Sequence, residues 1–190
     1  MQLSTHTAVD WFHFYREICD DVMIKNAKPI GGPGIRVQID ESKFGKRKYH
    51  RGHHVEGQWV FGGIEEGSRN NFIVPVEKRN RDTLLPIIQK FILPGSIIIS
   101  DYWKAYDILG ELDYTHLKVN HSIEFVNTEG DHTNKIEGHW RQAKSKLPPF
   151  GIRKNFFTNY IGEFMWRYAN EDKDLFYEII TDISRLYTFK

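Results

Sequence analysis

Residues 96–100 constrain the fold of this chain more than any other segment. They read Ser-Ile-Ile-Ile-Ser, with no alternation between apolar and polar positions. Consecutive β-branched residues without a polar side predict a strand that is buried on both faces. A strand of this kind lies inside a sheet that has helices on both sides, so an α/β fold is expected.

The segments on either side of this strand predict the remaining elements. Residues 35–40, 58–64 and 71–76 have strand patterns and are joined as an antiparallel meander. A weaker strand is expected near residues 116–119. Helices are predicted over residues 8–24, 81–92, 102–109, 134–147, 155–169 and 173–187. The order of elements predicts a ribonuclease-H-like mixed sheet: a three-strand antiparallel meander plus parallel strands, flanked by helices.

A cluster of helix breakers divides the chain near its start. The segment from Pro29 to Gly34 holds two prolines and three glycines, which is typical of a boundary. Residues 1–30 are therefore expected to form an N-terminal helical segment. Residues 31–190 are expected to form one domain with C-terminal helices, a size that suits a single core.

Composition excludes several classes of protein. The single cysteine, Cys19, permits neither an internal disulfide nor a cysteine-rich zinc site, and the acids around it favour a buried, unreactive thiol. The longest apolar run is far shorter than the roughly 18 residues of a membrane helix. The N-terminus lacks the pattern of a secretory signal, so a protein that is not secreted is expected.

Positive charge is concentrated although the net charge is only +1. The segment from Lys43 to His54 contains five Lys or Arg residues, three His residues and no acid. A second basic stretch includes Arg141 and Lys144. Such patches can bind phosphate groups, although solvated surface is the more common role of a charge run. The predicted DNA-binding residues are Lys43, Lys46, Arg47, Lys48, Arg51, Arg141 and Lys144. Zinc binding by His50, His53 and His54 is disfavoured by their close spacing.

Three acids occupy positions that suit a metal site. Asp40 is expected to end the first strand, Asp101 follows the buried strand, and Glu137 lies at the start of a helix. Ends of neighbouring strands lie side by side, so their carboxylates can share a divalent ion such as Mg²⁺, which prefers oxygen ligands. Such ions can stabilise the attacking and leaving oxygens of a phosphoryl transfer.

Each acid also has a structural alternative. Asp40 with Glu41 can begin a turn, and Asp101 can cap the helix that follows it. Asn134 and Glu137 fit a capping box, with the asparagine as the cap and the glutamate three residues later. Glu137, Arg141 and Lys144 also share one helical stripe, which is typical of an ordinary ion pair as well as of a site that holds metal and phosphate together. The presence of all three acids on suitable elements favours the metal site.

Several segments carry a resemblance to a known family. They are residues 39–52, 55–64, 93–95, 100–106, 119–122 and 132–141. In this order they resemble Merlin-type DNA transposases and their bacterial insertion-sequence relatives, over about residues 8–169. The resemblance implies a DDE-type triad on a ribonuclease-H-like fold, and the triad falls on Asp40, Asp101 and Glu137. Asn134 is the reserve for the third position, because some relatives have asparagine there.

The resemblance implies a function and its setting. We expect the catalytic core of a transposase that uses Mg²⁺ or Mn²⁺ to cleave DNA at element ends and to join the 3′-OH to target DNA. Its partners would be double-stranded DNA and further copies of itself assembled on DNA, with no membrane. Residues 1–30 would be the remnant of an upstream DNA-binding region. The protein would be nuclear in a eukaryote and cytoplasmic otherwise. The alternative is a domesticated, non-catalytic descendant that binds DNA or protein.

Overall fold

The computed structural model of the protein describes residues 4–45, 57–119, 133–148 and 152–187. The chain forms two compact units. One comprises residues 28–150 and is called the sheet unit below. The other combines residues 1–27 with residues 151–190 and is called the helical unit.

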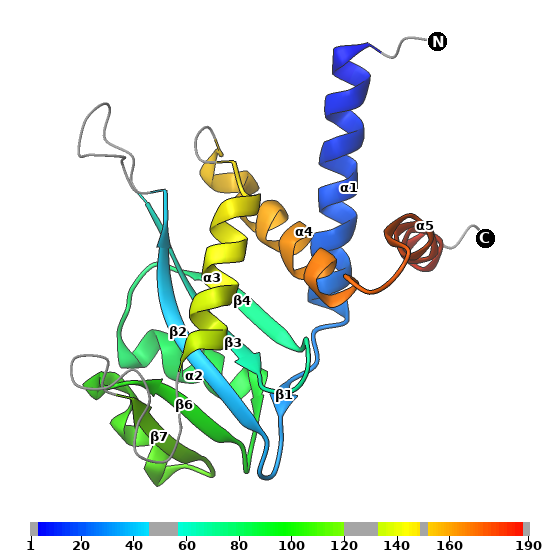
Figure 1. The fold of residues 1–190 in the computed structure, drawn as a ribbon. Helices are drawn as coiled ribbons and strands as arrows, with labels where there is room; N and C mark the ends of the chain where they lie inside the picture. The colour runs from blue at the N-terminus through cyan, green and yellow to red at the C-terminus, as the bar shows by residue number, and fades with distance from the viewer. Residues whose placement is uncertain (1–3, 46–56, 120–132, 149–151, 188–190) are drawn as a thin grey trace. The chain divides into compact units, whose positions relative to one another are not determined.

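The sheet unit is built around five strands in the order β4-β3-β2-β6-β7 (Figure 1). The strands are β2 (Arg36–Phe44), β3 (Gln58–Glu65), β4 (Asn71–Val76), β6 (Ile97–Asp101) and β7 (Thr115–Val119). β2, β3 and β4 form an antiparallel meander, while β6 and β7 run parallel to β2. This confirms the predicted mixed sheet, and the fold is ribonuclease-H-like. A second, two-stranded parallel sheet joins β1 (Ile30–Gly31) to β5 (Ile92–Leu93).

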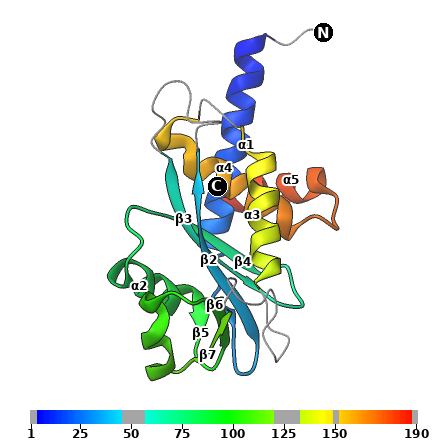
Figure 2. The same cartoon turned by 60° about the vertical axis from the view of Figure 1, so that its left-hand side comes forward.

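Helices lie on both faces of the five-stranded sheet, as the buried strand predicted. One face packs against α2 (Arg81–Phe91) and the 3-10 helix η2 (Lys104–Glu111), which together complete the main core. The other face carries α3 (Asn134–Lys146), which contacts β2 and β3 (Figure 2). β6 is enclosed between these layers, and its Ile98 and Ile99 are both fully buried.

Side chains of β2 alternate between these two layers. Val37 and Ile39 enter the core on the side of α2. Gln38 and Asp40 form hydrogen bonds with α3. The prediction that Asp40 ends this strand is wrong, because β2 continues to Phe44. The extension is held by the antiparallel ladder to β3, which pairs residues from Val37 as far as Phe44.

The helical unit consists of α1 (Thr5–Lys25), α4 (Phe157–Ala169) and α5 (Leu175–Leu186), with the short 3-10 helix η3 (Lys154–Phe156) before α4. Its core contains Ile18, Cys19 and Trp166. The buried position of Cys19 confirms the sequence-based interpretation, and burial raises the pKa of its thiol to about 12. Val9 and Phe12 are exposed, and the residues of α1 that pack in or against this core begin at Phe14.

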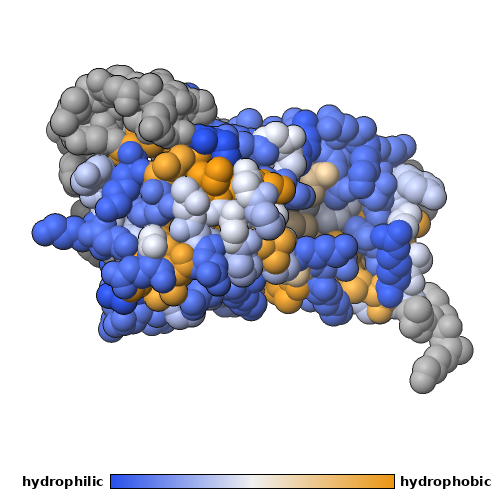
Figure 3. All heavy atoms as spheres, turned by 90° about the horizontal axis from the view of Figure 1, so that it is seen from below, coloured by the Kyte–Doolittle hydropathy of each residue, from blue (hydrophilic) through white to orange (hydrophobic). Residues whose placement is uncertain are grey.

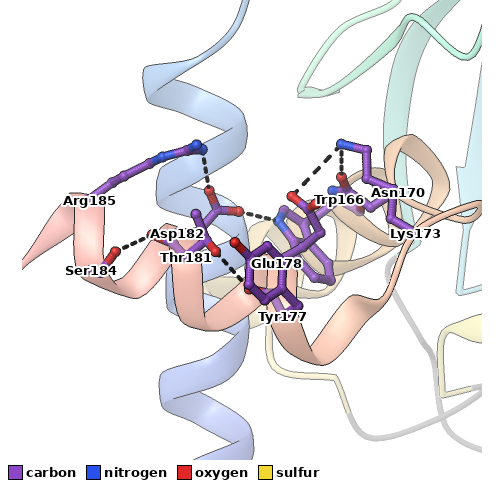
Figure 4. Close-up of polar contacts among 9 residues, drawn as sticks. All are labelled: Trp166, Asn170, Lys173, Tyr177, Glu178, Thr181, Asp182, Ser184 and Arg185. Atoms are coloured by element: carbon purple, nitrogen blue, oxygen red, sulfur yellow. Dashed lines mark hydrogen bonds and ion pairs between the residues drawn. The ribbon is translucent and has the colours of Figure 1, made fainter.

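A buried polar contact joins α4 to α5. The indole nitrogen Nε1 of Trp166 donates a 2.8 Å hydrogen bond to Oδ2 of Asp182, and Arg185 approaches the other oxygen of the same carboxylate (Figure 4). Both helices also pack against α1, so the three helices belong to one unit. This grouping differs from the division into residues 1–30 and 31–190 that the sequence suggested.

The outer surface is mixed in character. Figure 3 shows one face on which hydrophobic residues are interspersed with hydrophilic ones. Within the ranges that the structure describes, none of the helices combines the length and the apolar content of a membrane span.

Candidate active site

The sheet brings Asp40 and Asp101 onto neighbouring strands. β2 and β6 pair in parallel from Arg36 with Ile97 to Gln38 with Ile99. Asp40 and Asp101 each lie two residues beyond the last of these pairs, so both follow the same pleat toward α3. Adjacent strands are about 4.8 Å apart, which brings the two carboxyl groups into electrostatic contact. Accordingly, Asp101 helps to raise the pKa of Asp40.

Asp40 is held in place by α3. Nε1 of Trp140 donates a 3.0 Å hydrogen bond to Oδ2 of Asp40. Burial, followed by the negative charge of Glu41, raises the pKa of Asp40 to about 7, while the Trp140 hydrogen bond acts in the opposite direction. The Asp40 carboxylate is thus costly to ionise in its surroundings, and a cation bound beside it would relieve that cost.

Asp101 supplies the strongest sign of a ligand site. Its Oδ1 atom is buried and accepts no hydrogen bond from any residue in the described part of the chain. A buried carboxylate oxygen without a partner is unfavourable, and a bound cation is one of the few ways to satisfy it. Two adjacent carboxylates with an unsatisfied oxygen fit the oxygen-rich coordination that Mg²⁺ and Mn²⁺ prefer.

Glu137 lies on α3, one helical turn before Trp140. Oγ1 of Thr133 donates a 3.3 Å hydrogen bond to its Oε1 atom. Over the four described ranges, no group of three or more His, Cys, Asp and Glu side chains is close enough to hold a metal ion. The structure therefore brings the two aspartates together, and the joining of Glu137 to them stays a prediction.

The start of α3 is fixed by a residue of β2 and not by a capping box. Oε1 of Gln38, which is fully buried, accepts 3.0 Å hydrogen bonds from the backbone N–H groups of Lys135 and Ile136. The capping position is occupied by Thr133, and Asn134 is the exposed first residue of the helix. The capping-box alternative for Asn134 and Glu137 is wrong, because the first N–H groups of the helix are already paired with Gln38.

Further contacts dock α3 on the sheet. Nζ of Lys135 donates to the carbonyl oxygens of Glu65 and Ser68, at 2.6 and 2.7 Å. At the other end of the helix, Nζ of Lys144 donates a 2.7 Å hydrogen bond to Oγ of Ser42. The ends of α3 are thus tied to β2 and to the turn after β3, which leaves little freedom for the side chains between them.

The predicted DNA-binding residues are only partly within the described chain. Lys43 lies in β2, with Nζ 5.7 Å from the centre of the Trp59 ring, and Arg141 and Lys144 are exposed on α3. Lys46, Arg47, Lys48 and Arg51, together with His50, His53 and His54, lie outside the described residues. Lys43 is thus on the strand that carries Asp40, and Arg141 and Lys144 are on the helix that carries Glu137.

An ionic cluster around the buried Glu41 side chain, on the other face of β2, was not predicted from the sequence. Oε2 of Glu41 accepts hydrogen bonds from Nε and Nη2 of Arg79, and Oε1 accepts one from the hydroxyl of Tyr106. The guanidinium of Arg79 also lies 4.3 Å from the centre of the Trp59 ring and 5.3 Å from that of Trp103. The sequence held a signal for this cluster. Glu41 continues the alternating series of apolar residues that enter the core, and a buried acid needs a cationic partner.

Comparisons with known proteins identify the family of the chain. The model of the family described as "ISXO2-like transposase domain" matches residues 27–169. An "Uncharacterized transposase-like protein" of Haemophilus influenzae is 35% identical over 102 residues, which make up 53% of this chain and 82% of that protein. Of solved structures, the catalytic core of BIV integrase is 13% identical with a TM-score of 0.45, covering 80% of this chain and 96% of that one.

The HTLV-2 integrase catalytic core in complex with magnesium is 14% identical, with a TM-score of 0.40 over 74% of this chain and 87% of that one. The family model covers more than half of the chain, and the Haemophilus relative is matched over most of its length. The chain therefore belongs to the ISXO2-like transposase domain family.

Proposed function

We propose that this chain is the catalytic core of a DDE-type transposase. It cleaves DNA at the ends of a transposable element and joins the 3′-OH to target DNA. The observation that carries the proposal is the proximity of the Asp40 and Asp101 carboxyl groups on neighbouring strands. The buried Oδ1 atom of Asp101 has no hydrogen-bond partner among the described residues. In a transposase family, such a pair is the expected core of a divalent metal site.

Asp40, Asp101 and Glu137 would hold Mg²⁺ or Mn²⁺. When bound, such ions polarise the scissile phosphate and favour the ionised form of the attacking hydroxyl group. The side chains themselves have separate tasks. Trp140 orients Asp40 through its hydrogen bond. Gln38 fixes the start of α3, from which Glu137 extends. Arg141 and Lys144, on the helix that carries Glu137, would bind DNA phosphates, and so would Lys43, Lys46, Arg47, Lys48 and Arg51.

The proposed activity implies particular partners and relatives of the protein. It acts on double-stranded DNA as a homo-oligomer assembled on element ends, in the cytoplasm of a bacterium or the nucleus of a eukaryote. It would be related to bacterial insertion-sequence transposases and, through them, to Merlin-type transposases. An enzyme is favoured over a non-catalytic descendant, because all three acids of the proposed triad are present.

The proposal is tested with DNA cut from the two ends of the element that encodes the chain. Cleavage and strand transfer are measured with Mg²⁺ for the wild type and for Asp101→Asn. The variant should lose more than about 100-fold in rate, because loss of a metal ligand removes several kcal/mol of transition-state stabilisation. Asp113→Asn is the control, since Asp113 is exposed and precedes β7 at the other end of the sheet. Equal rates for wild type and Asp101→Asn would refute the proposed site.

A further inference from the structure

An exposed aromatic residue follows directly after Asp101. Tyr102 is 67% exposed. The other large hydrophobic residues exposed in the described part of the sheet unit, Ile35 and Leu93, are near 40%. They precede β2 and β6, at the opposite end of the strands. Tyr102 is therefore the one strongly exposed aromatic ring in the described part of this unit, and it adjoins the carboxylate pair.

The backbone beside Tyr102 is well anchored. The ring of Trp103 packs edge-on against Tyr106, with 5.4 Å between ring centres, and lies 5.3 Å from the guanidinium of Arg79. Tyr106 in turn donates its hydroxyl hydrogen to buried Glu41. The residue after Tyr102 is thus fixed to the core. The backbone from which the Tyr102 ring projects is therefore held by the fold, which lowers the cost of ordering this segment when a partner binds.

A cation lies beside the exposed ring. Nζ of Lys118 is 5.4 Å from the centre of the Tyr102 ring and 2.6 Å from Oδ1 of Asp107. Lys118 and Lys104 both act on the Asp107 carboxylate and lower its pKa. Lys118 thus places a positive charge beside an aromatic ring. Proteins bind single-stranded nucleic acid with this combination, because rings stack on bases and cations meet phosphates.

The position of Lys118 limits what can reach both groups. In the register between β6 and β7, Ser100 pairs with Lys118 and Asp101 with Val119. Lys118 therefore faces the side of η2, whereas Asp101 faces the side of α3. A DNA strand that contacts both must pass around the end of the sheet. A duplex is too stiff to make such a bend within a few base pairs, but an unpaired nucleotide can do so.

We propose that Tyr102 and Lys118 bind one unpaired nucleotide next to the bond that is cut, with the base stacked on the Tyr102 ring and its phosphate beside the Lys118 ammonium. This inference rests on the proposed function, since it takes DNA as the substrate. It adds a preference that the carboxylate pair alone does not supply: the site accepts a DNA end whose last base pairs have opened.

The experiment compares two probes made from the element end, in the presence of Mg²⁺. One is a blunt duplex, and the other has the same duplex followed by unpaired nucleotides, the first of which is 2-aminopurine. The wild type should bind the frayed probe about tenfold more tightly, which is about 1.4 kcal/mol, because one base gains a stacking contact with the Tyr102 ring. Binding should also quench the 2-aminopurine fluorescence.

Four variants separate the contributions. Tyr102→Ala should abolish both the preference and the quenching, and Tyr102→Phe should retain them because the ring is kept. Lys118→Ala should weaken binding of the frayed probe and reduce the slope of its salt dependence by about 0.7. Lys90→Ala is the matched control and should change nothing, because Lys90 likewise lies over a ring, that of Phe91 at 5.1 Å, but on α2.

The outcomes distinguish this inference from the proposed function. Equal wild-type affinity for the two probes, or a preference that persists in Tyr102→Ala, would overturn the nucleotide site and leave the transposase proposal intact. Failure of the wild type to bind either probe would overturn both. Unchanged melting temperatures of the variants would show that the effects do not arise from unfolding, as expected for a side chain as exposed as Tyr102.

Discussion

Asp40 and Glu41 are adjacent acids with different surroundings, because consecutive residues of a strand point to opposite faces. Glu41 is paired with the guanidinium of Arg79 and accepts a hydrogen bond from Tyr106. Asp40 accepts a hydrogen bond from the neutral indole of Trp140. The charge of Glu41 is thus balanced within the fold, whereas that of Asp40 is balanced only if a cation binds. Glu41 therefore stabilises the fold, whereas Asp40 suits catalysis.

The raised pKa of Asp40 predicts how stability depends on pH without metal. Its folded-state pKa is about 7 and its ordinary value is 3.8, so the folded state favours the protonated form. The stabilisation is complete below pH 3.8 and is lost as the pH rises through about 7. Asp40→Asn avoids this loss and keeps an acceptor for Trp140. In EDTA, urea unfolding should show it to be more stable than wild type by about 2 kcal/mol at pH 8.

The same comparison at pH 4.5 should give a difference well under half as large, since Asp40 is then protonated in the folded wild type. With saturating Mg²⁺ at pH 8 the order should reverse, because the wild type gains stability from binding and Asp40→Asn does not. A stability difference that is independent of pH would contradict the assigned pKa.

Glu137 is best tested by Glu137→Gln, which keeps the size of the side chain and the acceptor for Thr133. We expect strand transfer with Mg²⁺ to fall by about 100-fold or more, because the charge that holds the metal is lost. The melting temperature in EDTA should barely change, and the rise caused by Mg²⁺ should shrink. Asn134→Ala should leave strand transfer intact. If Asn134→Ala abolished the reaction and Glu137→Gln did not, Asn134 would be the third residue.

At the scale of elements, α3 and β2 form the scaffold of the site. Gln38, Asp40 and Ser42 project from one side of β2, and each forms a hydrogen bond with α3. The i, i+2 spacing of the strand matches the rise of the helix from its first turn to Lys144. A shift of β2 by one residue would turn all three away from α3, so the register of the sheet and the geometry of the site are coupled.

Removal of the Gln38 amide should therefore lower the free energy of unfolding more than truncation of an exposed side chain at the start of α3. Gln38→Met keeps the shape of the side chain but leaves two N–H groups of α3 without their acceptor. We expect the free energy of unfolding to fall by about 2–3 kcal/mol in urea titration. Asn134→Ala is the control and should cost under about 0.5 kcal/mol, since its side chain is exposed. Similar losses for the two variants would mean that Gln38 does not cap the helix.

At the scale of the whole molecule, the proposed chemistry and the terminal helices belong to different units. Residues 28–150 carry the sheet, α3 and the acids, while α1, α4 and α5 share a separate core around Trp166. Each unit has its own buried acid with a partner: Glu41 with Arg79 in the sheet unit and Asp182 with Trp166 in the helical unit. A substitution in the core of one unit is thus expected to destabilise that unit before the other.

Asp182→Ala tests this division. It removes the acceptor of the buried Trp166 indole, and a buried donor without a partner costs about 1–3 kcal/mol. Hydrogen exchange followed by mass spectrometry should show faster exchange in α1, α4 and α5, with β2, β3 and β6 still protected. Asp182→Asn, which keeps an acceptor oxygen, should lie close to wild type. Equal acceleration across the strands of the sheet would indicate that the two units unfold together.

The sequence by itself determined the strands of the main sheet, most of the helices and the class of the fold, but not the short strands β1 and β5. Alternation of apolar residues identified β2, β3 and β4, and the run at 96–100 identified the buried strand β6, because periodicity follows from backbone geometry within each segment. The motifs around Asp40, Asp101 and Glu137 pointed to a transposase, and the family comparison confirmed that broader assignment. These features are local, so a single sequence contains them.

Only the tertiary structure decided which partners those elements use. It extended β2 to Phe44 by pairing it with β3, and it placed α4 and α5 with α1. It also showed that the start of α3 is capped by Gln38, which is 97 residues before Lys135 in the chain, and not by the capping box that the sequence offered as an alternative. Each of these outcomes depends on hydrogen bonds or packing between segments far apart in sequence, and such partners are chosen by the shared core and not by local pattern.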